Sequence, residues 1–447
     1  MMNWDKLISA KRLGLEHRLV DGEIARSQFQ RDYDRLIFSS PFRRLQNKTQ
    51  VFPLPGSVFV HNRLTHSLEV ASVGRTLGSA LAHELSQRDD IQNKHLMPEI
   101  GAIVSTACLA HDMGNPPFGH SGEKALSEFF SKGKGKEIQS RVTKEQWLDL
   151  NNFEGNANAF RMLTHQLKGR RKGGYALTYT SIASLIKYPF GSDAMGKKNK
   201  FGFFETERET YLKIANELHL IQKSDSPAEF VRHPLVYLVE AADDISYLVM
   251  DVEDAHKLKI LSTEQTHQIL CAFFRPIEDQ YVFDGMRKVF EEVSDVNERV
   301  AYLRAMVINK LAQEAIQIFL DNENEILKGE FQKSLVDHLP PHLNEAMESC
   351  RDLSFQKIYK HPSVVKIELA GHNILGGLLD EFVGAILDPD SYYSNNLLSL
   401  LPEQFDVRQD ELYFNLRSVL DFVSGMTDIY ALDLYRKIKG IGMDSYV

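Results

Sequence analysis

Cysteine is scarce in this chain. Its 447 residues include three cysteines, Cys108, Cys271 and Cys350, which are odd in number and far apart along the sequence. A disulfide framework usually needs an even number of cysteines, so these thiols are more typical of buried apolar side chains in a reducing compartment.

Long apolar segments are also missing. The chain contains no run of about 18 apolar residues, which is the length that a membrane-spanning helix requires. Its first residues, Met-Met-Asn-Trp-Asp-Lys, lack the apolar segment of a secretory signal. We therefore expect no transmembrane helix, no membrane partner and a cytoplasmic location.

An excess of positive charge is absent as well. The net charge is -9, and a composition of 43% hydrophobic and 25% charged residues is ordinary for a globular protein. The negative balance disfavours a dedicated nucleic-acid-binding protein, although a local basic patch can still bind phosphate groups. The length suffices for two or three domains, but no Pro- or Gly-rich linker and no internal repeat divides the chain.

Alternating strand patterns are scarce, whereas helical patterns are common. Apolar residues recur at steps of three to five, as in the series that begins at Leu64 and ends at Leu81. We therefore predict an all-α fold with at most a short β-hairpin near 51–60. Further helical patterns cover residues 101–112, 235–255, 292–327, 372–387 and 415–438.

Two polar stretches interrupt the helical patterns. Residues 131–145 are polar and basic, and we expect them to form a mobile loop. Residues 165–200 contain eight Lys or Arg and a single acid, Asp193. Any single basic residue there is most simply a solvated charge, but together they are the obvious supply of groups for binding phosphates.

A His-Asp dipeptide ends the most apolar of these helices. It consists of His111 and Asp112, while His66 is a polar residue in another helix and Asp243 or Asp244 adds a further carboxylate. Two imidazoles and two carboxylates suit a divalent cation such as Mn, Mg, Fe or Ni. A metal bound in this way activates water near neutral pH, which favours hydrolysis of a phosphate ester. An isolated His-Asp pair, by contrast, is usually a surface or capping feature.

Helical spacing separates the two candidate aspartates. Asp243 shares its helix face with Tyr247 and Asp251, whereas Asp244 shares its face with Leu248. The polar stripe indicates a pocket wall and the leucine indicates the edge of a core. We therefore choose Asp243 as the metal ligand, with Asp244 behind it to orient a ligand.

A second pair of polar residues follows a loop rich in Gly and Pro at 113–119. His120 lies at the start of the next predicted helix and Glu123 in its first turn, so both project from one place. A carboxylate beside an imidazole orients the ring and holds its proton, as general acid–base catalysis requires. The competing interpretation is that Glu123 complements the helix dipole and His120 caps the loop.

Six stretches contain these residues and their surroundings. They are Ser-Ser-Pro-Phe-Arg-Arg-Leu-Gln-Asn-Lys-Thr-Gln-Val-Phe at 39–52, Asn-Arg-Leu-Thr-His-Ser-Leu-Glu-Val at 62–70, Ala-His-Asp-Met-Gly-Asn-Pro-Pro-Phe-Gly-His at 110–120, Phe-Glu-Gly-Asn-Ala at 153–157, Ala-Ala-Asp-Asp-Ile-Ser-Tyr at 241–247 and Gly-Met-Thr-Asp-Ile-Tyr-Ala at 425–431. In this order, and over nearly the whole chain, they resemble the bacterial deoxyguanosine triphosphate triphosphohydrolases of the HD-domain phosphohydrolase superfamily.

The resemblance implies a role for each matching residue. His66, His111, Asp112 and Asp243 match the metal ligands, and His120 and Glu123 match the catalytic pair. The matches to substrate-binding positions are Gln50 on the sugar and base side, Arg63 at the α-phosphate, Tyr247 and Asp251 at the deoxyribose, and Lys187, Tyr188 and, less closely, Lys200 at the triphosphate.

The same resemblance implies hydrolysis of deoxynucleoside triphosphates, chiefly dGTP, to the deoxynucleoside and inorganic triphosphate. It also implies a divalent metal cofactor and a homo-oligomer, with a hexamer favoured, and it leaves room for single-stranded DNA or a regulatory nucleotide as a further partner. We expect an HD-domain catalytic core at residues 1–260 and a C-terminal helical region at residues 261–447 packed on it.

Two other functions fit parts of the sequence. One is an HD phosphohydrolase that acts on a nucleoside monophosphate or on guanosine tetraphosphate, and the Lys-Thr-Gln at 48–50 counts against it. The other is a non-catalytic protein that binds nucleotides or single-stranded nucleic acid, which the basic stretches favour and the intact His120 and Glu123 disfavour. The reaction products distinguish the three.

Overall fold

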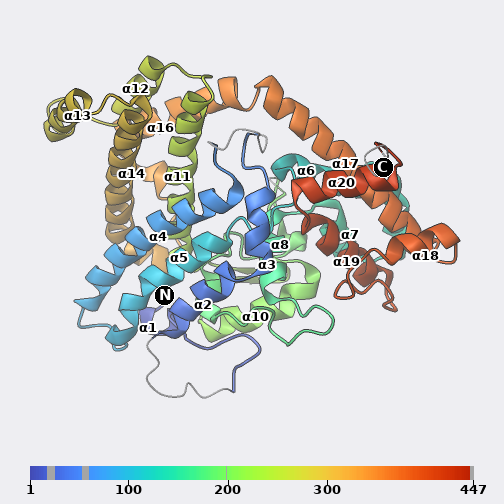
Figure 1. The fold of residues 1–447 in the computed structure, drawn as a ribbon. Coiled ribbons are helices and arrows are strands. Elements are labelled where there is room, and N and C mark those ends of the chain that lie inside the picture. Colours follow the sequence, from blue (N-terminus) through green and yellow to red (C-terminus); the bar gives the residue numbers. More distant parts are fainter. Residues whose placement is uncertain (18–25, 53–59, 198, 443–447) are drawn as a thin grey trace.

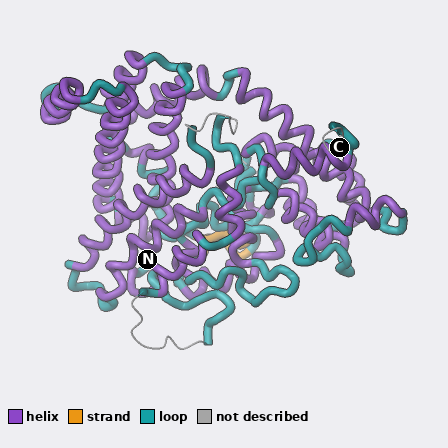
Figure 2. The backbone as a smooth tube through the Cα atoms, in the orientation of Figure 1, coloured by secondary structure: helices purple, strands orange, loops and turns teal. Residues whose placement is uncertain are grey.

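The computed structural model describes residues 1–17, 26–52, 60–197 and 199–442. Over these residues the fold is all-α, as predicted (Figure 1). Two short antiparallel strands, β1 (Gln222–Asp225) and β2 (Ala228–Phe230), form the only sheet of the described residues, and Figure 2 shows them enclosed by loops. The hairpin predicted near 51–60 falls mostly on residues 53–59, which lie outside the described residues.

The N-terminal half contains the helices that carry most of the predicted site. Its α-helices are α1 (Trp4–Leu7), α2 (Gln28–Ile37), α3 (Ser40–Arg44), α4 (Arg63–Ser86), α5 (Ile100–Ala110), α6 (Gly119–Ser131), α7 (Lys144–Asn151), α8 (Gly155–Thr164), α9 (Tyr179–Ala183), α10 (Arg208–Glu217) and α11 (Leu235–Lys257). Its 3₁₀ helices are η1 (Leu45–Asn47), η2 (Lys94–Glu99), η3 (Lys134–Arg141), η4 (Ser192–Ala194) and η5 (Glu205–Glu207).

The C-terminal half continues the helical pattern. Its α-helices are α12 (Thr263–Cys271), α13 (Gln280–Glu292), α14 (Val296–Asp321), α15 (Glu323–Lys328), α16 (Pro341–Leu353), α17 (Pro362–Leu387), α18 (Tyr392–Leu398), α19 (Leu412–Ser424) and α20 (Asp428–Ile438). Two further short elements are η6 (Val336–His338) and the π-helical turn η7 (Ser354–Ile358). None of the described helices is both long and apolar enough to cross a membrane.

Helices α4, α5 and α11 pack against one another at the centre of the molecule. Helix α5 is buried along its whole length apart from Ala102. It crosses α4 so closely that a Cβ atom at Gly78 would lie 2.9 Å from the carbonyl oxygen of Ile100, which only glycine avoids. The close packing of the two helices fixes the position of the first turn of α4 relative to the last turn of α5.

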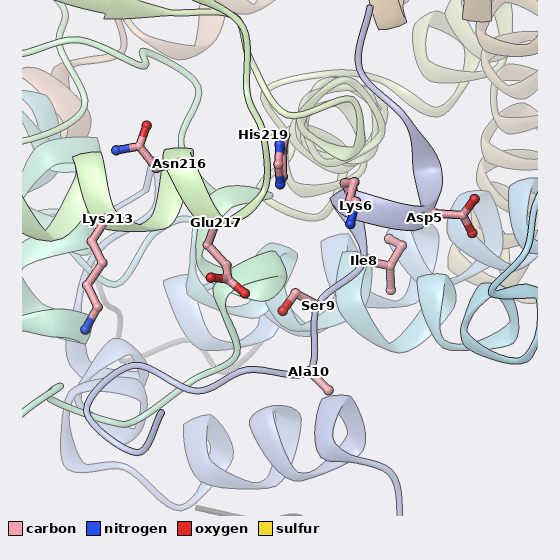
Figure 3. Close-up of a pocket in the computed structure, with 9 residues that line it drawn as sticks. All are labelled: Asp5, Lys6, Ile8, Ser9, Ala10, Lys213, Asn216, Glu217 and His219. Carbon is pink, nitrogen blue, oxygen red and sulfur yellow. The ribbon is translucent and has the colours of Figure 1, made fainter. Parts of the chain in front are cut away.

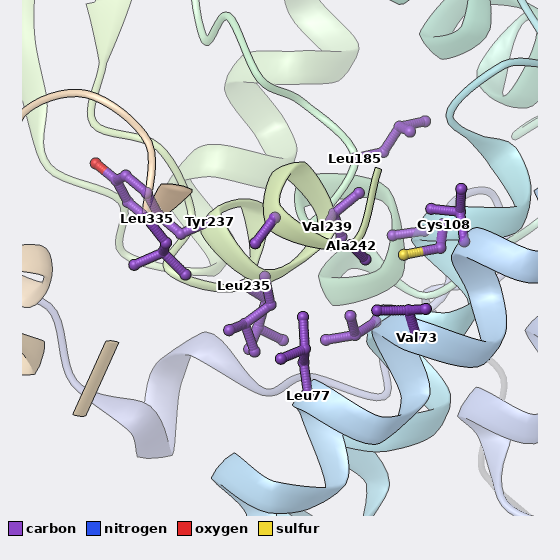
Figure 4. Close-up of a cluster of buried hydrophobic side chains, with 14 of the residues drawn as sticks. Val73, Leu77, Cys108, Leu185, Leu235, Tyr237, Val239, Ala242 and Leu335 are labelled. Atoms are coloured by element: carbon purple, nitrogen blue, oxygen red, sulfur yellow. The ribbon is translucent and has the colours of Figure 1, made fainter. Parts of the chain in front are cut away.

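The core between these helices is apolar. Figure 4 shows a part of it, where Val73 and Leu77 of α4 face Leu235 and Val239 of α11. Because protein interiors are densely packed, a polar side chain at the end of such a helix is held in place. The cysteines follow the expectation only in part, since Cys108 and Cys350 are buried and Cys271 is partly exposed.

A second apolar cluster joins the C-terminal helices to the rest of the fold. Helices α17, α19 and α20 pack on α6 and α7, with Leu126 and Phe130 of α6 against Leu375 and Leu378 of α17. In Figure 1, α17 runs across the upper right with α18, α19 and α20 beside it. Helix α6, whose second residue is His120, is therefore supported by the C-terminal helices.

Two expectations about local structure were wrong. Residues 131–145 form η3 and the start of α7 rather than a loop, because Ile138 is fully buried and Gly135 lies against the ring of Phe129. The pattern at 415–438 is not one helix but two, α19 and α20, since the chain turns after Gly425 and the side chain of Thr427 caps the second helix.

Candidate metal centre and active site

Three helices bring the predicted metal ligands together. His66 lies in the first turn of α4, His111 and Asp112 directly follow α5, and Asp243 lies in the middle of α11. His66, His111 and Asp112 each offer a ligand atom, and these atoms all lie within 4.8 Å of one another. The Asp243 Oδ1 atom lies 3.1 Å from His66 Nε2 and 3.5 Å from His111 Nε2. Three donors thus form a close cluster, and the Asp243 carboxylate lies beside both of its imidazoles.

The end of α5 orients the His111 ring. The backbone leaves the helix at His111. The ring Nδ1 donates a hydrogen bond to the Cys108 carbonyl oxygen over 2.6 Å. This hydrogen bond leaves Nε2 facing the aspartates and free to bind a metal, the arrangement that metal-binding histidines commonly show.

The cluster attracts positive charge. Burial penalises the ionised Asp112, but Arg63 and His111 together lower the pKa of its carboxyl group. Burial also penalises a charged His111, yet Asp112 and Asp243 raise the pKa of His111 to about 9. Arg63 Nη1 donates to Asp112 Oδ2 over 2.8 Å, so the Arg63 guanidinium lies directly beside this cluster.

The neighbouring aspartate, Asp244, makes no such contacts. Burial, together with the negative charge of Asp243, raises the pKa of its carboxyl group to about 7. Of the two aspartates, only Asp243 has an oxygen near both imidazoles. The geometry therefore favours Asp243 as the fourth donor.

The His120 and Glu123 side chains meet at the start of α6. His120 Nδ1 lies 3.1 Å from Glu123 Oε2, and the His120 side chain is 89% exposed whereas that of Glu123 is 13% exposed. The backbone N–H of Gly155 donates to Glu123 Oε1 over 2.9 Å, which fixes the carboxylate. The hydrogen bond to Glu123 raises the pKa of His120. An exposed imidazole on a fixed carboxylate is suited to proton transfer.

The two lysines predicted at the triphosphate each pair with an acidic side chain. Lys200 Nζ lies 2.7 Å from Glu154 Oε1, and Lys187 Nζ lies 2.8 Å from Glu240 Oε1. The Lys187 ammonium also lies 5.9 Å from the ring centroid of Tyr188. Lys200 is close enough to lower the pKa of Glu123, so this lysine belongs to the surroundings of the acid–base pair. Sequence reasoning placed Glu154 in a family stretch but assigned it no role.

Tyr247 and Asp251 extend from the metal cluster along α11. The Tyr247 ring makes an edge-on contact with His66 at 6.3 Å between centroids. A small cavity is lined by both residues together with His66 and Gln50, whose buried Oε1 atom has no hydrogen-bond partner among the described residues. The cavity thus lies beside the metal cluster and presents an unpaired acceptor.

Tyr359 was missed from the sequence. It directly follows η7, and its hydroxyl lies 2.6 Å from the Tyr247 hydroxyl and donates to Asp251 Oδ2 over 2.7 Å. The Tyr247 and Tyr359 rings stack at 6.4 Å between centroids. No motif surrounds Tyr359, and only a fold that returns the chain to α11 brings it there.

Comparison with known proteins gives two family matches and several relatives. An HD domain matches residues 63–226, and a phosphohydrolase-associated domain matches residues 338–437. A deoxyguanosinetriphosphate triphosphohydrolase-like protein of Synechocystis is 36% identical over 99% of this chain and 100% of its own. A protein of the same description from Pseudomonas aeruginosa is 35% identical over 98% and 99%. The deoxyguanosinetriphosphate triphosphohydrolase of Serratia proteamaculans is 31% identical over 92% and 93%.

The chain belongs to the deoxyguanosinetriphosphate triphosphohydrolase family. It is therefore an HD phosphohydrolase, as the resemblance of its motifs predicted. The matched HD range contains His66, His111 and Asp112 but ends before Asp243, so the fourth donor comes from a helix beyond that range.

In this family member, the C-terminal helices reach the active site through Asp428, the first residue of α20. Its Oδ2 atom accepts the backbone N–H of Thr49 over 2.8 Å, and its Oδ1 atom accepts that of Phe118 over 3.0 Å. Thr49 precedes Gln50, and Phe118 lies two residues before His120. One carboxylate therefore positions two loops that carry predicted site residues.

A buried ionic group supports the cavity beside Tyr247. His61 Nδ1 lies 2.7 Å from Asp254 Oδ1, and His61 Nε2 lies 3.0 Å from Glu69 Oε1. Burial penalises the charged ring, but the two carboxylates raise the pKa of His61 to about 10. His61 therefore carries a positive charge at neutral pH.

We expect His61→Ala to lower the free energy of unfolding at pH 6 by about 3 kcal/mol, because it leaves the Asp254 carboxylate buried and unpaired. A pKa that is raised on folding contributes stability that is complete below the unfolded pKa of about 6.5 and is lost as the pH rises through the folded value. The deficit of the variant should shrink at pH 10. Urea unfolding at both pH values measures the difference in free energy of unfolding between variant and wild type. His95→Ala, at an exposed histidine, is the control. An equal deficit at both pH values would contradict a charged His61.

A separate open hollow lies beside α10 (Figure 3). Three of its charged side chains have partners: Glu217 lies 2.7 Å from Lys11, Lys213 pairs with Glu16, and Asp5 accepts backbone N–H groups. We assign this hollow no ligand.

Proposed function

We propose that this protein hydrolyses deoxynucleoside triphosphates, preferably dGTP, to the deoxynucleoside and inorganic triphosphate in a metal-dependent reaction. The observation that carries the proposal is the cluster of His66, His111 and Asp112, with Asp243 beside both imidazoles. An acid–base pair and a tyrosine-lined cavity are its neighbours. Relatives named as deoxyguanosinetriphosphate triphosphohydrolases that align over nearly the full length support the choice of substrate.

The donor set fits a divalent cation such as Mn, Mg, Fe or Ni. Two imidazole nitrogens and two carboxylates balance the charge of such an ion, and His111 is already oriented toward it by the Cys108 carbonyl. When bound, the ion supplies a water of lowered pKa and polarises a phosphoryl oxygen.

Arg63 and the lysines neutralise the substrate. Arg63 donates to Asp112 in the free protein, and a ligand phosphate beside the cluster offers it a second acceptor. Lys187, Lys200 and Tyr188 bind the β- and γ-phosphates. Positive groups that are already held by Glu240 and Glu154 need little reorganisation when the anion arrives.

His120 and Glu123 move the proton. Water attacks the α-phosphorus, the bond from this phosphorus to the 5′ oxygen breaks, and that oxygen leaves as a hydroxyl group after it accepts a proton. His120, protonated and held by Glu123, donates that proton, and the carboxylate stabilises the charged ring until transfer.

Product analysis tests the proposal. Purified protein is incubated with dGTP and Mn²⁺, and the phosphates are separated by anion-exchange chromatography. Inorganic triphosphate with deoxyguanosine is the expected result. Orthophosphate or pyrophosphate would instead assign the protein to a different HD phosphohydrolase, and the absence of any product with each of the four metals would favour a non-catalytic nucleotide-binding protein.

We expect sugar selection to depend on the ring of Tyr247. The ring should pack on the deoxyribose, and Asp251 should accept a hydrogen bond from its 3′-hydroxyl. A 2′-hydroxyl has no room and no partner there, which costs on the order of 1–3 kcal/mol. Tyr247→Ala should therefore narrow the ratio of dGTP to GTP turnover by about tenfold, mainly through lost dGTP activity, whereas Tyr247→Phe keeps the ring and the ratio.

Steady-state rates with dGTP, GTP and 2′,3′-dideoxy-GTP measure these effects. Asp251→Ala should slow dGTP more than the dideoxy compound, because only dGTP has the 3′-hydroxyl. If Tyr247→Ala leaves the dGTP-to-GTP ratio unchanged, sugar selection lies elsewhere, and Gln50 is the next residue to replace.

A further inference from the structure

A second cavity lies behind the active-site loops, between α3, α8 and α19. Its volume is about 230 Å³, and its walls include Arg44, Arg170, Tyr175 and Phe405. A single water needs roughly 10–15 Å³ by this kind of measure, so the cavity has room for a small organic molecule. None of the residues predicted for metal, sugar or triphosphate binding lines it.

The charges around this cavity do not balance. Among the described residues, the cavity has one acidic side chain, Asp421. Asp421 forms an ion pair with Arg161, whose Nε and Nη2 atoms each donate to it over 2.8 Å. Arg161 also contacts Glu207 at 2.5 Å, so this part of the wall carries no excess charge. The excess lies with Arg44 and Arg170.

Among the described residues, neither of these two arginines pairs with an acidic side chain. Arg44 has no hydrogen bond or ion pair to an acidic side chain within the part of the chain that the structure describes, and burial lowers its pKa. Arg170 donates to the neutral side chain of Gln404 over 3.2 Å and also hydrogen-bonds the Tyr175 side chain. Burial raises the pKa of Tyr175, and the nearby Arg170 and Arg44 guanidinium groups oppose that shift. Two cations that converge with no acidic partner among the described residues favour a ligand with two negative charges.

Part of the remaining wall is apolar. Pro41, Met162, Leu167 and Phe405 line the cavity, and a doubly charged anion alone would leave these surfaces facing water. A ligand that joins an anionic group to a compact apolar body would cover both kinds of wall.

We propose that this cavity is a second ligand site, which binds a small molecule carrying a phosphate monoester on an apolar or aromatic body. Arg44 and Arg170 bind the phosphate, and Phe405 and its apolar neighbours pack on the body. The site is separate from the metal cluster and does not depend on the proposed reaction.

The cavity wall also contacts the loop that follows the metal ligands. Asn158 lines the cavity and donates to the Gly114 carbonyl over 2.7 Å, two residues after Asp112. Ser424 also lines the cavity, and the Ser424 carbonyl accepts a hydrogen bond from the buried Lys48 ammonium group over 3.0 Å. A ligand that contacts this wall of the cavity therefore also stabilises the loop around Gly114.

Binding of phenyl phosphate tests the site. Calorimetric titration is performed on the full chain in EDTA, so that no metal draws the probe to the cluster. We expect saturable binding, weaker binding of inorganic phosphate, and a dissociation constant that rises about tenfold in Arg44→Gln and again in Arg170→Gln, the usual effect of losing one charge-assisted hydrogen bond. Arg43→Gln, at an exposed arginine one residue away, is the matched control and should bind as the wild type does.

Two outcomes would overturn the site: equal affinity in Arg44→Gln, Arg170→Gln and wild type, or a loss of affinity in Lys187→Ala but not in the arginine variants. Thermal melting of each variant verifies that it folds, and Arg170 is exposed, so its replacement leaves the core intact. Hydrogen exchange at residues 112–118 should slow when phenyl phosphate is bound, and unchanged exchange would overturn the link to the metal loop. None of these measurements requires turnover, so a failed product assay leaves them interpretable.

Discussion

We expect Asp243→Ala to lose the bound divalent metal and dGTP hydrolysis together. Asp243 Oδ1 is the donor that faces both imidazoles, at 3.1 and 3.5 Å, so its removal leaves an incomplete set with insufficient negative charge. Metal content by elemental analysis and triphosphate release measure the two losses on one preparation.

Asp244→Ala is the matched control for this prediction. It removes the adjacent carboxylate from the same helix, yet Asp244 makes no contact with His66 or His111 among the described interactions. A residue outside the ligand set costs about 10–100-fold in metal affinity or activity at most. If Asp244→Ala loses the metal while Asp243→Ala keeps it, the assignment of the fourth ligand is wrong.

We expect His120→Ala to retain the metal and the nucleotide but to slow turnover by roughly 10²-fold or more, the usual size of a general acid–base contribution. The exposed ring contributes little to folding, since its side chain is 89% exposed and its one described polar partner is Glu123. Single-turnover rates, with nucleotide binding measured separately, distinguish lost chemistry from lost affinity.

Glu123→Gln should slow the reaction in the same direction, because it keeps the side chain's size but removes the charge that holds the His120 proton. Gly155 still finds an acceptor in the amide oxygen, so the loop is preserved. Unchanged turnover in both variants would leave the pair with a purely structural role in capping the loop and α6.

Much of the fold could be predicted from local patterns. The all-α class follows from apolar spacing, and the predicted helices at 101–112 and 235–255 agree closely with α5 and α11. These helices are strongly apolar and lie at the centre, where burial and pattern point to the same structure. Segments 131–145 and 415–438 were misread, because a single buried Ile138 and the three-residue turn 425–427 carry too little signal in the sequence.

The candidate site residues could be proposed from the sequence alone. Imidazoles and carboxylates at His66, His111, Asp112 and Asp243 were recognisable from residue type and helix position, and the stripe along α11 chose Asp243 over its neighbour. The ordered motifs then indicated the family, which the full-length relatives confirm.

Only the tertiary structure decided what surrounds those residues. Tyr359 meets Tyr247 from 112 positions away, Asp428 holds Thr49 from 379 positions away, and Arg44 faces a cavity closed by α19. Such contacts depend on how helices pack, and packing is decided by the shape and volume of many side chains at once. A local pattern records which face of a helix is buried, but it does not record which distant segment covers that face.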